Sequence, residues 1–170
     1  MNYFELFEIP VQLKVDKASL PRKFFELSRK YHPDFFVNGS KEEKIVALEK
    51  SALLNKAFNT FQNPDETIKY VLQLKGLLEE EEKYELPPDF LMEVLEINEE
   101  LMEGGENKTL FPNLEIRITE LQEEIYEPVK KIVESYKEGI SSEKELLQVK
   151  EYYYKKKYLD RIRQQLNGIT

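Results

Sequence analysis

The segment KYHPDFF at residues 30–36 contains His32, the single histidine of a 170-residue chain, followed by Pro33 and Asp34. Histidine and aspartate together can carry out general acid–base catalysis, and histidine can also bind a metal. Catalysis needs a partner group and a pocket, whereas a proline and one carboxylate in a predicted turn surround His32. An enzyme that uses His32 and Asp34 is therefore only a hypothesis to be tested. The tripeptide also fits a simple turn, because proline stops a helix and aspartate bonds to nearby amides.

The composition excludes several kinds of site. The chain has no cysteine, which excludes disulfides, thiolate zinc sites, directly ligated iron–sulfur clusters and cysteine nucleophiles. A single histidine excludes a multi-histidine metal site, so we expect neither a bound metal nor a cofactor. The apolar runs are too short to span a membrane, and the N-terminus lacks a signal-peptide pattern, which predicts a cytoplasmic protein. The net charge of −8 argues against nucleic-acid binding.

Helical spacing of apolar residues runs through most of the chain and predicts an all-α fold. After a short helix in NYFELFEI, a second helix is expected from Lys17 or Leu20 to Tyr31, with Asp16 or Ser19 as its cap. The apolar side of this helix consists of Leu20, Phe24, Leu27 and Tyr31. Its other side carries basic residues that we expect to be solvated: Arg22, Lys23, Arg29 and Lys30.

A third helix is expected to begin at the capping box formed by Ser40 and Glu43 and to end near Gln62. Its predicted buried residues are Ile45, Leu48, Ala52 and Phe58. Asn63 and Pro64 then begin a helix that ends at Gly76. The second and third helices should form an antiparallel hairpin, with the His-Pro-Asp segment at its turn.

The acidic, proline-ended stretch at 77–88 predicts a linker between domains at 1–76 and 89–170. Three further helices are expected: Asp89 to Glu103, about Leu110 to Lys137, and about Ser142 to Leu166. The middle helix repeats apolar residues at intervals of three and four, and Pro128 should kink it. The second domain is therefore predicted to be a three-helix bundle. In the last helix, the run YYYKKK is read as packed rings with solvated lysines rather than as a nucleic-acid or membrane contact.

The His-Pro-Asp segment, placed after a basic helix and between two antiparallel helices, resembles the J-domain of DnaJ-type co-chaperones. The resemblance implies that this helix and the tripeptide contact an ATP-driven chaperone of the DnaK or HscA class and stimulate its ATP hydrolysis. The implied contact residues are Arg22, Lys23, Arg29, Lys30, His32, Pro33 and Asp34. DnaJ-type turns commonly continue with lysine. Phe35 stands there in this chain, which removes a positive charge beside the contact.

Further segments extend the resemblance to the HscB family, the co-chaperones that deliver the IscU iron–sulfur scaffold to HscA. They are NYFELFEIP, SALLNKAFNTFQNP, YVLQLKG, FLMEVLEINEEL and KKKYLDRI. The cysteine-containing metal module of some members is absent. The resemblance therefore implies a non-enzymatic co-chaperone in iron–sulfur cluster assembly. A J-domain protein that delivers a different client remains the alternative.

The helix beginning near Asp89 carries two apolar stripes. Phe90, Val94, Ile97 and Leu101 form the first, and Leu91, Leu95 and Met102 form the second. From the spacing alone, the second stripe is either buried between neighbouring helices or an exposed protein-binding patch edged by carboxylates. The resemblance favours the patch, and it implies a scaffold-binding set of Leu91, Met92, Leu95, Glu96, Glu99, Glu103 and Tyr158.

Overall fold

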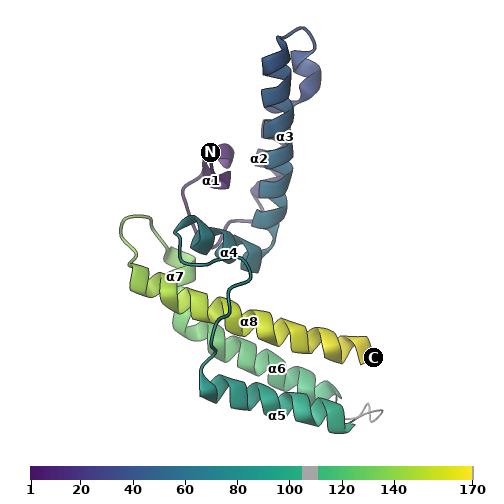
Figure 1. The fold of residues 1–170 in the computed structure, drawn as a ribbon, viewed down its shortest axis with the longest axis vertical. Helices are drawn as coiled ribbons and strands as arrows, with labels where there is room; N and C mark the ends of the chain where they lie inside the picture. The colour runs from purple at the N-terminus through teal and green to yellow at the C-terminus, as the bar shows by residue number, and fades with distance from the viewer. Residues whose placement is uncertain (105–110, 170) are drawn as a thin grey trace.

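The computed structural model describes residues 1–104 and 111–169, and within them it contains helices and no strand. The expected all-α fold is therefore confirmed. A two-helix hairpin rises steeply from a layer of helices, so the molecule has two arms (Figure 1). The turn of the hairpin lies at the end far from that layer. Leu110, the expected start of one helix, lies outside the described residues.

The first arm contains α1 (Tyr3–Phe7), α2 (Leu20–Tyr31), the 3₁₀ helix η1 (Pro33–Phe36), α3 (Lys41–Gln62) and α4 (Pro64–Leu74). The capping box of Ser40 and Glu43 begins α3, as predicted. Asn63 caps α4, because its side chain accepts the amides of Asp65 and Glu66. Ser19 occupies the N-cap position of α2, but its hydroxyl donates to the carbonyl of Asp16 instead of capping the helix.

Aromatic rings join α1 to the hairpin. The Phe61 ring on α3 lies 4.9 Å from that of Phe4 and 5.3 Å from that of Phe7, measured between centroids. The Tyr70 ring on α4 stacks on Tyr3 at 4.3 Å, and the Tyr3 amide donates to the Tyr70 hydroxyl. These contacts fix the base of the hairpin and leave its far end as two helices and a turn (Figure 1).

The predicted buried face of α3 was wrong. Ile45, Leu48 and Ala52 are exposed, and Phe58 is only half-buried. The face that packs inward carries other side chains: Ala47, Leu54, Ala57 and Phe61. The apolar side of α2 was predicted better, since Leu20 and Leu27 are buried and Phe24 stacks on Phe58 with a centroid distance of 4.2 Å.

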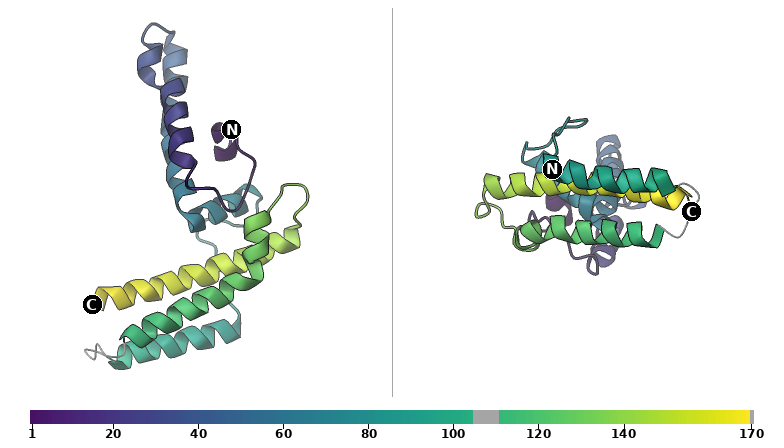
Figure 2. Two further views of the ribbon diagram at one scale, coloured as in Figure 1. Left: turned by 180° about the vertical axis from the view of Figure 1, so that it is seen from behind. Right: turned by 90° about the horizontal axis from the view of Figure 1, so that it is seen from below.

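The second arm contains α5 (Pro88–Gly104), α6 (Phe111–Tyr126), the 3₁₀ helix η3 (Glu127–Val129), α7 (Lys130–Ser135) and α8 (Glu143–Ile169). Helices α5, α6 and α8 run alongside one another (Figure 2). The single helix expected from about Leu110 to Lys137 is instead divided at Pro128, because proline lacks the amide that would continue the hydrogen bonding. Its expected apolar line is nevertheless half-buried at Ile132 and buried at its other members, which are Leu114, Ile118, Leu121, Ile125, Val129 and Tyr136.

Residues 77–87, placed in the predicted linker, are held against α8. Tyr84 stacks on Tyr154 with centroids 4.6 Å apart, and Glu82 pairs with Lys150 at 2.8 Å. The side chain of Leu78 is buried. The segment is thus packed along the helix, while the domain boundaries themselves stay a prediction.

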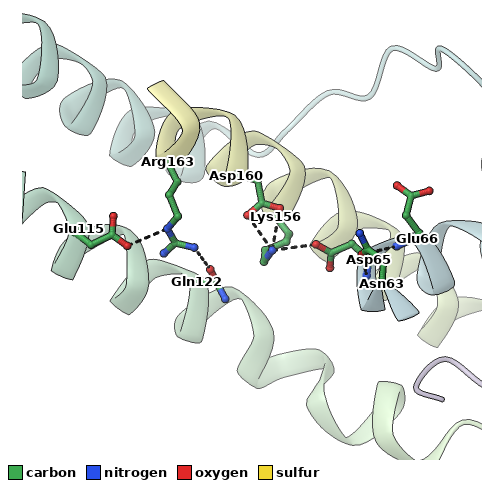
Figure 3. A network of polar contacts seen from close by, with 8 residues as sticks. All are labelled: Asn63, Asp65, Glu66, Glu115, Gln122, Lys156, Asp160 and Arg163. Atoms are coloured by element: carbon green, nitrogen blue, oxygen red, sulfur yellow. Dashed lines mark hydrogen bonds and ion pairs between the residues drawn. The ribbon is translucent and has the colours of Figure 1, made fainter. Parts of the chain in front are cut away.

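An ion cluster joins α4 to α8. The Lys156 ammonium lies 2.9 Å from Asp65 on α4 and 2.9 Å from Asp160, one turn along its own helix (Figure 3). Two further pairs connect the arms, Lys75 with Glu138 and Lys14 with Glu134. The expectation of solvated lysines in YYYKKK was therefore wrong for Lys156 and Lys155, whose side chains are only 14% and 20% exposed.

Candidate functional site

His32 lies at the far end of the hairpin, where it ends α2 and caps η1. Its Nδ1 accepts the Asp34 amide at 3.2 Å, and its carbonyl accepts the Phe35 amide at 3.1 Å. The side chains of His32 and Asp34 are 54% and 85% exposed. This arrangement explains the turn by local hydrogen bonding and leaves both side chains accessible to a partner protein. Within the described residues, no group of three or more His, Asp or Glu side chains is arranged to hold a metal ion.

The basic residues of α2 have different surroundings. Glu8, which follows α1, lies 3.3 Å from Lys23 and 3.8 Å from Lys30. Arg22 pairs with Glu26 on the next turn of α2 at 3.6 Å. Arg29 makes no ion pair with a described residue, and its guanidinium lies 5.8 Å from the centroid of the Phe25 ring. The expected solvated basic face is thus partly neutralised.

The two apolar stripes of α5 have different exposure. The first stripe is buried along its whole length, at Phe90, Val94, Ile97 and Leu101. On the second stripe, Leu95 is 51% and Met102 is 77% exposed, while Leu91 is half-buried against the core. Met92, beside that stripe, is 64% exposed. The α5 surface therefore presents apolar side chains to solvent. Their exposure costs free energy, which a binding partner would recover by covering them.

The acidic edge of this surface includes a contact that the sequence analysis missed. Arg117 on α6 lies 3.8 Å from Glu96 and 2.6 Å from Glu100. Glu96 is thus partly neutralised, whereas Glu99 and Glu103 are exposed without a described basic partner. Because Leu91 lies about 140° round the helix from Glu96, this leucine is on the side of α5 away from Arg117.

Tyr158, the expected contact on α8, is half-buried and packs against the core. Tyr152 and Tyr153 are buried, as expected of packed rings. Burial raises the pKa of Tyr153 to about 12, and the carboxylates of Glu66 and Asp65 add to this shift. Lys155 also lies against the bundle, with its ammonium 5.6 Å from the Phe90 ring centroid. The rings of this segment therefore support the fold.

Comparison with known proteins gives the family. Residues 86–167 match the model of the HSCB C-terminal oligomerisation domain. A protein of Vibrio vulnificus named Co-chaperone protein HscB homolog is 34% identical over 125 residues, covering 71% of this chain and 73% of that protein. The chain belongs to the HscB co-chaperone family. Other HscB homologs match over a shorter stretch: that of Photobacterium profundum is 38% identical over 102 residues, which span 60% of its length.

Solved HscB structures share the fold along nearly the whole chain. The chaperone HscB from Vibrio cholerae has a TM-score of 0.73 at 25% identity, covering 99% of this chain and 97% of the other. Human co-chaperone HscB has a TM-score of 0.78 at 28% identity, covering 98% of this chain and 81% of the human one. The matched relatives are named co-chaperones, which are a non-enzymatic class of protein. No helix among the described residues is long and apolar enough to cross a membrane.

Proposed function

We propose that this HscB-family protein stimulates the ATPase of an HscA- or DnaK-type chaperone and delivers to it an IscU-type iron–sulfur scaffold. The family membership supports a co-chaperone role, and the His-Pro-Asp turn supports an ATP-driven chaperone as one partner. The iron–sulfur cluster would be carried by the scaffold, because this chain has no cysteine to bind it.

The separation of two exposed surfaces carries the proposal. His32 lies at the far end of the hairpin, and the exposed Met92 and Leu95 lie on α5 in the other arm (Figure 1). A protein bound to one surface would leave the other free. Holding both partners on one chain raises the concentration of the scaffold near the chaperone, without requiring a new contact between them.

The proposed assignment gives each arm one partner. The chaperone would contact Arg22, Lys23, Arg29, Lys30, His32, Pro33 and Asp34. The scaffold would contact Leu91, Met92, Leu95, Glu96, Glu99, Glu103 and Tyr158. We further propose that residues 1–76 form the J-domain, that 77–88 connect the arms, and that 89–170 form the scaffold-binding domain.

Chaperone ATPase, measured with and without the scaffold, tests this function. The intact chain should raise the rate, and the scaffold should raise it further. His32→Gln should abolish the stimulation, because it removes an exposed contact and little packing, and circular dichroism should show the fold intact. Unchanged stimulation by this variant would exclude the J-domain role. Stimulation by the intact chain without scaffold binding in a pull-down would indicate a different client.

A further inference from the structure

Helix α2 has two exposed sides that carry different kinds of residue. Lys23 and Lys30 are seven residues apart and therefore share one side, which Glu8 covers with its carboxylate. Phe25 lies about 140° to 160° round the helix from them, beside Arg29. The Phe25 side chain is 62% exposed, and the guanidinium of Arg29 lies 5.8 Å from its ring centroid. The open side of α2 thus carries an aromatic ring beside a cation that forms no ion pair with a described carboxylate.

The spacing connects this side to the His-Pro-Asp turn. Phe25, Arg29 and His32 stand at positions i, i+4 and i+7, which lie on one face of a helix. The line continues past the helix, because the Phe35 ring lies edge-on to the His32 ring with centroids 6.4 Å apart. Phe35 is 69% exposed. We name these residues the exposed line: Phe25, Arg29, His32 and Phe35.

The exposed line has the composition of a binding anchor. Aromatic residues and arginine are enriched among the residues that contribute most to protein–protein affinity. The attraction between a guanidinium and an aromatic ring is strongest when water is excluded, which happens when a partner covers the pair. The exposed Phe25 is not part of the core side of α2, which is formed by Leu20, Phe24 and Leu27.

We propose that Phe25 and Arg29 are the anchors for the ATP-driven chaperone, which packs along the exposed line, and that the Glu8-covered Lys23 and Lys30 contribute less to its affinity. The inference rests on the proposed function, because the line ends in the His-Pro-Asp turn that the proposed function assigns to this partner. The matching chaperone surface is an apolar depression edged by carboxylates. Phe35 then extends the apolar contact, in the position where DnaJ-type turns commonly have a lysine.

The test measures the affinity of the full-length chain for a purified DnaK-class chaperone in ATP, using Phe25→Ala, Arg29→Gln and Lys30→Gln. Loss of an aromatic anchor should weaken binding about tenfold. Arg29→Gln should weaken binding more than Lys30→Gln, although both remove one charge from the same turn of α2. Phe25→Tyr keeps the ring, so its affinity for the chaperone should stay within about twofold of that of the native chain.

Leu53→Ala is the matched control. Leu53 is an exposed apolar residue of the same hairpin, and it lies about 160° round α3 from Ser51, whose hydroxyl contacts α2. Its truncation should leave affinity unchanged, and thermal melts should show every variant folded. Equal losses for Phe25→Ala and Leu53→Ala, or no loss for Phe25→Ala, would overturn the inference.

His32→Gln distinguishes a failure of the anchor proposal from a failure of the proposed function. If His32→Gln abolishes stimulation while Phe25→Ala binds normally, the J-domain role stands and the anchor is wrong. If His32→Gln stimulates normally, the proposed function fails and the anchor proposal fails with it. A double change of Phe25→Ala and Arg29→Gln adds a further check. Its loss should be smaller than the two single losses combined, because the pair acts as a unit.

Discussion

The carboxylate of Glu8 lies 3.3 Å from the ammonium nitrogen of Lys23, across the gap between α1 and α2. Glu8 reaches this position from a left-handed backbone conformation, with φ of 57°, which ends α1. Most residues other than glycine avoid that conformation. The same carboxylate also lies 3.8 Å from Lys30, so one acidic residue lowers the positive potential along one side of α2.

Glu8→Gln should speed association with the chaperone. The change removes a negative charge beside Lys23 and Lys30, and exposed charges act mainly on encounter. We expect an increase of about two- to threefold at low salt that disappears at high salt, because salt screens exposed charges. Stopped-flow association rates at two salt concentrations measure it. Glu49→Gln on α3 removes an exposed carboxylate that forms no ion pair with a described residue, and it should change the rate less. Equal rates for Glu8→Gln and the native chain would show that Glu8 has no part in docking.

The exposed α5 side chains should contribute to scaffold binding and little to stability. Met92→Ala combined with Leu95→Ala should weaken scaffold binding at least about tenfold, because apolar anchors cost more than 1 kcal/mol each when truncated. The melting temperature should stay near that of the native chain. Isothermal titration and a thermal melt of the same samples give both quantities.

Val94→Ala provides the opposite case on the same helix. Val94 is 1% exposed, so its truncation leaves a cavity and should lower the melting temperature. Leu91 is intermediate and should show both effects when truncated. If Met92→Ala with Leu95→Ala melts as early as Val94→Ala, these side chains support the core and the proposed scaffold surface is wrong.

Sequence periodicity predicted the helices better than it predicted their packing. On α2, one apolar side was available, and its buried Leu20 and Leu27 were identified. On α3, apolar residues lie on more than one side, and spacing does not decide which side meets α1 and α2. Ile45 and Leu48 were therefore placed in the core, although the structure exposes them.

The candidate sites show the same limit. The exposure of Leu95 on α5 was undecided from spacing, because a helix in a bundle has two neighbours; only the family resemblance favoured a surface. The pair of Glu8 with Lys23 depends on a left-handed residue and on the packing of α1 against the hairpin. The pair of Arg117 with Glu96 depends on how α6 lies beside α5. Such contacts between elements leave no signal in local sequence.

The stability of the fold should fall as the pH rises above 10. The pKa of Tyr153 and of Tyr154 is raised to about 12, mainly by burial, from an ordinary value of 10.0. Between pH 10 and 12 the unfolded chain loses these protons while the folded chain keeps them, so unfolding becomes easier as pH increases. Chemical denaturation from pH 9 to 11.5 measures the slope. Tyr153→Phe removes one titrating group and should make the slope shallower; an unchanged slope would show that this phenol titrates normally in the fold.

Lys156 should hold the two arms at a fixed angle. Its ammonium is shared by Asp65 on α4 and Asp160 on α8, at 2.9 Å from each, and its side chain is 14% exposed. Despite desolvation by burial, hydrogen bonds to Asp160 and Asp65 raise its pKa, so the amine stays charged. Lys156→Met removes this cation and leaves two carboxylates facing each other across the junction, which is strongly unfavourable when burial limits solvation.

We expect Lys156→Met to broaden the distribution of angles between the arms. The native chain has no cysteine, so spin labels at Asn38→Cys in the hairpin turn and Gln165→Cys on α8 report one distance between the arms. Lys155→Met is the matched control, because the neighbouring Lys155 pairs only with Glu151 on its own helix, among the described ion pairs. Chaperone and scaffold should each still bind the Lys156→Met chain alone, because neither proposed surface includes the junction, but the extra ATPase stimulation caused by the scaffold should decrease. An unchanged distance distribution would show that the apolar packing of α4 and α8, where Ile68 and Tyr152 are buried, and not the ion cluster, sets the angle.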